Sequence, residues 1–260
     1  MPQLKVGIQL SSLRLPLKKA LQTAAELGAT AVEIDARGEM KPQDLSQTGL
    51  RQLRKMFDDL NLSVCAVGFR TRRGYNVEQE LEGRIAATKA AMQFARSLGA
   101  PVVINQVGRV PSESEGKDWE LLLTVLRDLG HYGHHFGALL AAETGSESGA
   151  DLARLIAALP AGALGINLDP GNLIVNGFSP LDAVEALGPH ILHVHAKDGV
   201  HDLAQGRGVE VPLGRGVVDF PALLGALEEQ DYRGYFTIER TGGDDPIYEV
   251  GQAVKYLKNL

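Results

Sequence analysis

The sequence has few of the features that identify disulfide-bonded, membrane-spanning or secreted proteins. Cys65 is the only cysteine among 260 residues, which excludes a disulfide within the chain and predicts a reducing, cytoplasmic environment. Uninterrupted apolar runs such as 138–142 are too short to span a bilayer, and the opening segment 3–10 has the pattern of a strand, not of a signal peptide. We therefore expect a soluble protein without a membrane partner.

Positive charge is also in short supply. The chain has 26 Lys and Arg residues against 32 Asp and Glu residues, a formal net charge of −6. A surface that binds nucleic acid needs clustered, excess Lys and Arg, so we expect no nucleic-acid partner. The hydrophobic fraction of 44% is ordinary for a globular protein and sufficient for a buried core.

A regular alternation of short apolar runs and longer amphipathic stretches fills the chain. The expected strands are 4–10, 31–35, 62–68, 101–105, 138–143, 164–169, 190–196 and 234–239. Helical spacing occurs at 16–27, 46–60, 77–98, 118–135, 149–158, 180–187, 220–229 and 246–258. The count of eight, the even spacing and the lack of a glycine-rich turn after the first strand favour a closed barrel over an open doubly wound sheet. We predict an α/β fold, a single (β/α)₈ TIM barrel domain over 1–260.

One long segment, 197–219, has neither pattern and is rich in glycine. Irregular stretches of this length in a compact domain are more often functional loops than spare chain, although an ordinary surface loop is the alternative. We predict that it closes over a substrate. Its Arg207 and Arg215 could clamp a phosphate or carboxylate, and we expect such a role for only one of them.

Polar residues end the last four expected strands. Glu143, Asp169, His195 and Glu239 each follow an otherwise apolar run, and the carboxyl ends of barrel strands meet at one mouth. Taken singly, each could cap a helix or face water. Three carboxylates close together repel one another unless a cation lies among them, and a set of three oxygens and one nitrogen suits Mn²⁺, Mg²⁺, Co²⁺ or Zn²⁺. We therefore predict one divalent metal ion at this mouth. By alternation, His193 lies one layer deeper, where it could orient a neighbour, contact substrate or be a core histidine.

Two further motifs carry a resemblance to a known family. The HAKD run at 195–198 and the PLGRGVVDF run at 212–220, together with the four strand-end residues, resemble the xylose-isomerase-like TIM barrel family. That family includes sugar isomerases and epimerases, inosose dehydratases and hydroxypyruvate isomerases. The resemblance implies that Glu143, Asp169, His195 and Glu239 bind the metal. In the ketose 3-epimerase branch the two glutamates also transfer the substrate proton, which implies catalytic roles for Glu143 and Glu239. That branch usually has a histidine where Asn172 stands, which puts the 3-epimerase assignment in doubt.

These residues predict a metal-dependent sugar isomerase or epimerase. It would act by proton transfer through a cis-enediolate on a small ketose, aldose or related hydroxy-carbonyl compound. The alternative on the same site is an inosose-type dehydratase, which expels a β-hydroxyl. Lys197 could stabilise the enediolate or only pair with Glu239 or Asp198, and Glu33 could bind a distal hydroxyl or be a rim carboxylate. The expected substrate-binding residues are Asn172, His193, Lys197, Arg207 and Glu33.

Two rival functions use a similar barrel. A zinc phosphodiesterase of the apurinic-endonuclease kind needs histidines at the ends of the second, third and fourth strands, which here end in Asp35, Gly68 and Asn105. A non-catalytic barrel that binds sugar would not need the four-residue set. We expect a small-molecule carbohydrate as the partner, and the sequence leaves a homo-oligomer open.

Overall fold

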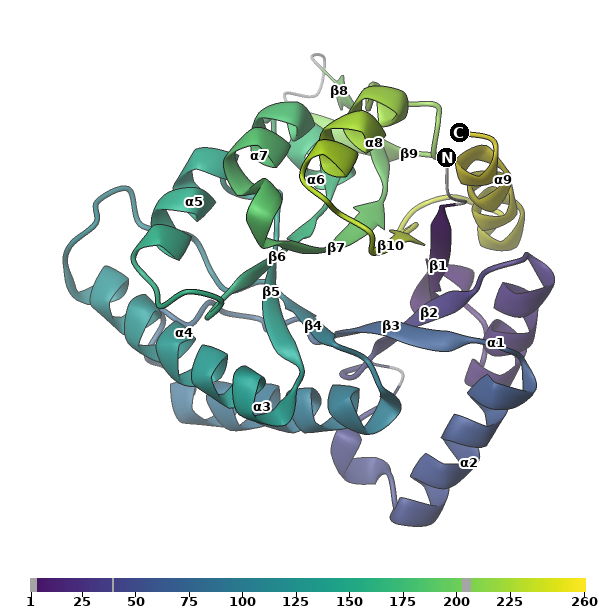
Figure 1. Ribbon diagram of the computed structural model, residues 1–260, viewed down its shortest axis with the longest axis horizontal. Helices are drawn as coiled ribbons and strands as arrows, with labels where there is room; N and C mark the ends of the chain where they lie inside the picture. Colours follow the sequence, from purple (N-terminus) through teal and green to yellow (C-terminus); the bar gives the residue numbers. More distant parts are fainter. Residues whose placement is uncertain (1–3, 39, 203–206) are drawn as a thin grey trace.

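Eight parallel strands close into a barrel in the computed structural model, which describes residues 4–38, 40–202 and 207–260. Neighbouring strands follow chain order around the ring, and β10 pairs with β1 to close it (Figure 1). The strands are β1 Lys5–Gln9, β2 Ala31–Asp35, β3 Ser63–Gly68, β4 Val102–Asn105, β5 Leu139–Glu143, β6 Gly165–Leu168, β7 Ile191–Ala196 and β10 Tyr235–Ile238. The predicted TIM barrel is confirmed, and every expected strand agrees to within one residue at each end.

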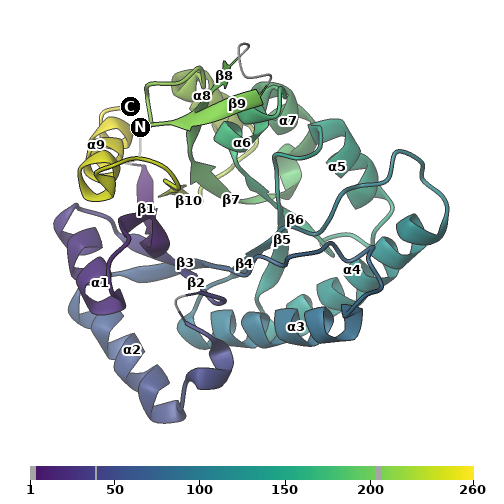
Figure 2. The ribbon, with the colours of Figure 1, turned by 180° about the vertical axis from the view of Figure 1, so that it is seen from behind.

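Helices form the outer layer of the molecule (Figures 1 and 2). They are α1 Leu17–Glu26, α2 Gln47–Asp59, α3 Leu81–Leu98, α4 Lys117–Phe136, α5 Gly149–Ala157, α6 Pro170–Val175, α7 Pro180–Leu187, α8 Phe220–Glu229 and α9 Pro246–Lys258. Short 3₁₀ turns occupy Leu10–Leu13, Pro42–Asp44 and Gly188–His190. Ser or Asp side chains accept the first free N–H groups of six helices, which explains why these helices start where they do. Among the described residues, no helix combines the length and hydropathy needed to cross a bilayer.

The segment after β7 is more regular than the sequence predicts. Two strands, β8 Asp198–Asp202 and β9 Arg207–Val211, pair antiparallel from Asp198 with Val211 to Asp202 with Arg207. The expectation of an irregular 197–219 loop is therefore wrong for these strands, because local glycine and charge obscured the pairing. Residues 203–206 lie outside the described part of the chain. Figure 2 shows this hairpin beside β7 and α6, and the proposed closing role of the segment stays a prediction.

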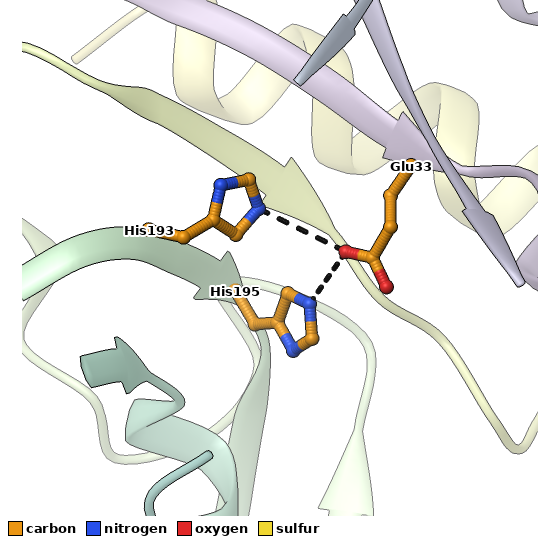
Figure 3. Close-up of side chains that lie close together, drawn as sticks. All are labelled: Glu33, His193 and His195. Atoms are coloured by element: carbon orange, nitrogen blue, oxygen red, sulfur yellow. Dashed lines mark hydrogen bonds and ion pairs between the residues drawn. The ribbon is translucent and has the colours of Figure 1, made fainter. Parts of the chain in front are cut away.

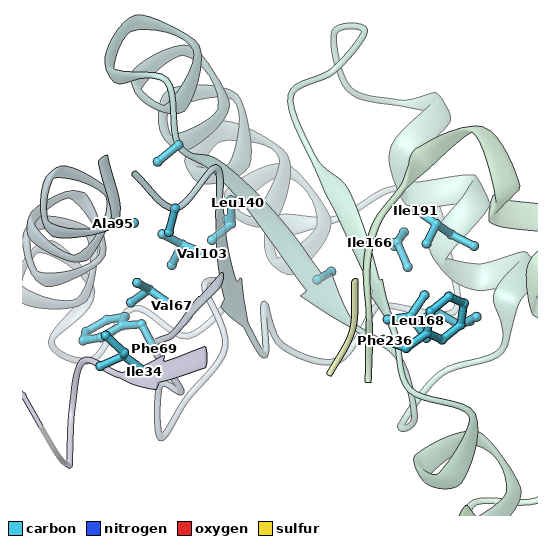
Figure 4. Close-up of a cluster of buried hydrophobic side chains, with 14 of the residues drawn as sticks. Ile34, Val67, Phe69, Ala95, Val103, Leu140, Ile166, Leu168, Ile191 and Phe236 are labelled. Atoms are coloured by element: carbon cyan, nitrogen blue, oxygen red, sulfur yellow. The ribbon is translucent and has the colours of Figure 1, made fainter. Parts of the chain in front are cut away.

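Two apolar clusters hold the barrel together. The larger one fills the space between strands and helices and includes Ile34, Val103 and Leu140 (Figure 4). The smaller one consists of Ala66, Val102, Ile104 and Ala141. Its members share the inward side of their strands with residues such as Glu143, because side chains alternate along a strand. The interior of the barrel is thus apolar away from the mouth and polar at the mouth, where the carboxyl ends of the strands lie.

Candidate active site

Four side chains converge at the carboxyl end of the barrel. Glu143 ends β5, Asp169 follows β6 and caps α6, His195 lies in β7, and Glu239 follows β10. All four are buried, and one ligand atom from each lies within 4.8 Å of the others. The structure therefore brings together the four residues that the sequence predicts as metal ligands.

His195 is the centre of this cluster. Its Nδ1 lies 3.0 Å from a carboxylate oxygen of Glu239, 3.3 Å from one of Glu143 and 3.8 Å from one of Asp169. Its Nε2 lies 2.7 Å from Glu33 Oε2, within hydrogen-bonding distance (Figure 3). A proton on Nε2 leaves the Nδ1 lone pair facing the carboxylates, which is the form of histidine that binds a metal.

The donor atoms fit a divalent cation. Asp169 Oδ2 and Glu239 Oε2 are buried and accept no hydrogen bond from any described residue. Buried carboxylate oxygens without a hydrogen bond are costly, and a cation between them and His195 Nδ1 would satisfy both. Three oxygens and one imidazole nitrogen suit Mg²⁺, Mn²⁺, Co²⁺ or Zn²⁺.

Charges at the site strongly perturb one another. Burial raises the pKa of Asp169, and Lys197 offsets only part of that rise. Burial acts in the same direction on Glu239, but His195 and Lys197 outweigh it and hold the pKa of that carboxyl well below its usual range. Burial lowers the pKa of His195, but Glu33 and Glu239 outweigh it and raise this pKa well above its usual value. The negative charges of the cluster thus favour a positive charge at its centre.

A buried chain of hydrogen bonds supports the cluster from the first strand. Gln9 Nε2 donates to Glu33 Oε1 (3.1 Å), and the Ser12 hydroxyl donates to Gln9 Oε1 (3.1 Å). Ser12 Oγ in turn accepts the backbone N–H of Arg240, the residue after Glu239 (2.9 Å). This series of hydrogen bonds therefore links His195 to the backbone beside Glu239. Within it, Glu33 is the hydrogen-bonding partner of His195. A direct contact between Glu33 and substrate stays a prediction.

Arg70 is a site residue that the sequence analysis missed. It follows β3 and is half-exposed, and its guanidinium contacts Glu239 Oε1 and lies 3.3 Å from Glu143 Oε1. Gln106, after β4, donates to the other oxygen of Glu143 (3.1 Å). Neither residue ends a strand, so the search of strand ends passes over both. The RTRR run at 70–73 was the available signal.

The other predicted substrate contacts lie in different places. Lys197 Nζ is 3.5 Å from Glu239 Oε2 and 3.6 Å from Asp169 Oδ2. Asn172 lines a pocket beside the cluster, and its backbone N–H donates to Asp169 Oδ1 (2.7 Å).

His193 lies deeper in the barrel, with Nε2 3.8 Å from Glu33 Oε2 (Figure 3). Burial, and next the charge of His195, lower the pKa of His193 well below its usual value, which keeps it neutral. Arg207 begins β9, but its side chain lies outside the described part of the chain, and Arg215 is exposed in the turn that follows.

Asp198 explains why the HAKD and PLGRG motifs occur together. Its buried carboxylate accepts the backbone N–H groups of Gly214 (3.0 Å), Gly216 (2.8 Å) and Val218 (3.2 Å). A Cβ atom on Gly216 would overlap this carboxylate, so the position requires glycine. The two motifs form one structural unit that fixes the chain next to Lys197.

Comparisons with known proteins agree with this geometry. The chain is similar to the inosose dehydratase of Clostridium beijerinckii, with 24% identity over 276 positions that cover 91% of this chain and 88% of that protein. It resembles the solved structure of a xylose isomerase domain protein from Planctomyces limnophilus, with a TM-score of 0.86 and 26% identity over 99% of this chain and 97% of that one.

Two more distant structures share the fold. One is a xylose isomerase-like TIM barrel protein from Mycobacterium smegmatis in complex with magnesium, with a TM-score of 0.77 and 19% identity over 99% of this chain and 95% of that one. The other is the 3-keto-D-glucoside 4-epimerase of E. coli, with a TM-score of 0.78 and 17% identity over 99% of this chain and 100% of that one. The sequence profile of one family matches residues 21–260, a span that contains the whole four-residue cluster. The chain therefore belongs to the xylose isomerase-like TIM barrel family.

Proposed function

We propose that this protein is a divalent-metal-dependent dehydratase that removes water from a small polyhydroxylated ketone of the inosose type. The observation that carries the proposal is the convergence of two glutamates, Asp169 and His195 Nδ1 on one buried point. The similarity to an inosose dehydratase over most of the chain supports dehydration as the reaction at this point.

Glu143, Asp169, His195 and Glu239 would hold the ion. When bound, such an ion draws electrons from a ketone oxygen and makes the neighbouring C–H bond more acidic. Burial lowers the pKa of Lys197, but Asp169 and Glu239 outweigh it and raise that pKa, so the side chain stays an ammonium. Lys197 thus places a permanent positive charge beside the oxygen that becomes negative.

One of the two glutamates supplies both proton transfers of the dehydration. Glu143 or Glu239 takes the proton from the carbon next to the ketone, and the electron pair of that C–H bond moves into the ketone, whose oxygen becomes negative. When these electrons return, a double bond forms between that carbon and the carbon that carries the β-hydroxyl. The bond to the β-hydroxyl breaks, and the hydroxyl takes the proton back from the same glutamate and leaves as water. The net change is the loss of one water from the substrate, and the enzyme returns to its starting state.

A second candidate is the sugar epimerase or isomerase that the sequence also predicts. It is favoured by the presence of two glutamates at one site, 3.3 Å and 3.0 Å from His195 Nδ1. In that reaction Glu143 removes the proton to give a cis-enediolate, and Glu239 returns a proton to the opposite face or to the neighbouring carbon, or the two exchange roles.

The two rival functions receive less support. Among the described residues, both groups able to hold a metal include His195, and neither contains a histidine from β2, β3 or β4. A zinc phosphodiesterase would need such histidines. A barrel that only binds sugar does not account for four buried, converging metal-ligand side chains.

The test is incubation of the Mg²⁺-loaded or Mn²⁺-loaded enzyme with a panel of inososes, ketoses, aldoses and hydroxypyruvate in D₂O. A product lighter by one water supports the dehydratase. Deuterium incorporation with the carbon skeleton and composition retained supports the epimerase or isomerase. If neither change occurs with any compound, both candidate functions are wrong.

Amide variants of the glutamates test their part in proton transfer. At saturating metal, Glu143→Gln or Glu239→Gln, whichever glutamate transfers the proton, should lower turnover by roughly 10²–10⁴-fold, because an amide has no usable basicity; in the epimerase both variants should do so. Asp169→Asn is the control, since a residue that only binds metal should regain most of its activity when metal is added in excess. Full rescue of both glutamine variants by metal would contradict the proton-transfer role.

A further inference from the structure

The loops after β3 and β4 bring a cluster of arginines to one side of the barrel mouth. Arg72 and Arg73 come from the first loop, and Arg109 comes from the second. Together with Glu143 they line a pocket of about 360 Å³. The arginines therefore lie in the same pocket as one of the proposed proton-transfer residues.

These two loops are fixed to each other by their backbones. A Cβ atom on Gly108 would lie 2.5 Å from Gly74 Cα, so the chains approach as closely as only glycine permits. The backbone N–H of Tyr75 donates to Val107 O (2.9 Å), and the Asn76 side chain donates to Arg109 O (3.3 Å). The loops thus present their arginines from a defined backbone.

The positive charge of this pocket is only partly compensated. Arg72 forms no hydrogen bond or ion pair with any described residue, whereas Arg73 lies 3.4 Å from Glu80. Glu147 is the carboxylate of the pocket wall that attracts Arg109, but no hydrogen bond or ion pair joins the two within the described chain. Two guanidinium groups are therefore available on a protein whose net charge is −6.

The acidic groups of the pocket have partners of their own, although those of Glu147 are incomplete. Glu143 contacts Arg70 and accepts a hydrogen bond from Gln106. Glu147 is 7% exposed, and its Oε2 accepts the hydroxyl hydrogen of Ser146 (2.5 Å), whereas its buried Oε1 accepts no hydrogen bond from a described residue. Arg72 and Arg109 are exposed and need no partner from the protein, and an anionic oxygen group is the ligand that matches the paired donors of a guanidinium.

We propose that Arg72 and Arg109 bind an anionic oxygen group, a carboxylate or a phosphate, on the substrate, whose ketone lies at the four-residue cluster. This inference rests on the proposed function, because it names the substrate class of that same site. The substrate is thus a polyhydroxylated ketone of the proposed type that also carries a negatively charged group.

The test compares three ligands that share a hydroxy-ketone: dihydroxyacetone, hydroxypyruvate and dihydroxyacetone phosphate. Their affinities for the Mg²⁺-loaded protein are measured by titration calorimetry at low ionic strength. We expect at least one anionic ligand to bind about tenfold or more tightly than dihydroxyacetone, the scale of a charged hydrogen bond. Preference for one anion identifies the group as carboxylate or phosphate.

Arg72→Gln and Arg109→Gln should each reduce this preference by about fivefold or more, and the matched control Arg51→Gln, on the exposed side of α2, should not. Circular dichroism checks that each variant is folded, and if one is not, the other decides. Equal binding of all three ligands, or a preference that survives the tested variants or falls equally in the control, overturns the inference. Loss of water from a neutral inosose without any anion preference would retain the proposed function and reject only this inference. Anion binding through these arginines, with no loss of water from any compound of the panel, would reject the proposed function and retain this inference.

Discussion

Glu33 acts on the proposed metal site through His195, so its substitution tests positioning. Glu33→Gln keeps the size of the side chain but removes the charge that faces His195 Nε2 at 2.7 Å. We expect metal affinity to fall by about 10–100-fold, the usual effect of removing a carboxylate behind a metal-binding histidine. Titration calorimetry with Zn²⁺ measures the change, with the exposed Glu26→Gln as control. An unchanged affinity in Glu33→Gln would show that His195 needs no such support.

Cys65 gives a stability prediction at alkaline pH. Burial raises the pKa of this thiol from 9.0 to about 12. Between these values the unfolded chain has lost the thiol proton and the folded chain keeps it, so stability present below the lower value is lost as the pH rises. The free energy of unfolding should fall by up to about 1.4 kcal/mol per pH unit from this group. Urea unfolding from about pH 8 to about pH 10 measures the slope. The slope should be shallower in Cys65→Ala, and equal slopes would contradict the assignment.

The sequence predicts part of the site well and part of it poorly, for a physical reason. Glu143, Asp169, His195 and Glu239 end apolar strands, and strand ends of a barrel meet at one mouth whatever the details of packing. Arg70 reaches the cluster from a loop, and a loop position depends on backbone turns that no periodicity encodes.

At the scale of secondary-structure elements, Asp198 is the residue whose loss should matter most for the unit after β7. Its carboxylate accepts backbone N–H groups from the turn that follows β9, and an amide would turn one acceptor into a donor facing them. We expect Asp198→Asn to lower the free energy of unfolding by about 2–3 kcal/mol. Chemical denaturation measures this, with the exposed Asp244→Asn as control. A loss no greater than that of the control would show that the turn holds without the charge.

The sequence predicts the barrel strands more accurately than it predicts this hairpin. Strands such as β6 are buried on both sides and appear as continuous apolar runs, so their bounds follow from the sequence. Strands β8 and β9 mix glycine with charged residues. They are held in place by pairing with each other and by contact with α6, and not by an apolar face. Gly208, for example, lies against Val175 of α6 so closely that a Cβ has no room.

For the molecule as a whole, metal removal should lower stability. Three buried carboxylates share one region, and an ion that binds only the folded state stabilises that state. At about 100 times the dissociation constant, the gain should be about 2.7 kcal/mol. Thermal melts with EDTA and with Mg²⁺, Mn²⁺, Co²⁺ or Zn²⁺ measure it, and Asp169→Asn should lose most of the gain. A melting temperature that none of the four ions raises would contradict the metal site.

The hydrogen bond between Ser12 and the backbone of Arg240 joins residues 228 positions apart in the chain. We expect a contact between residues so far apart to form late in folding, because the entropy cost of loop closure must be met before it forms. Glu239 enters its place together with β10, the strand that also completes the ring with β1. We therefore expect high-affinity ion binding to appear with ring closure and not before it. During refolding, the moment of metal uptake thus marks the last step of barrel assembly.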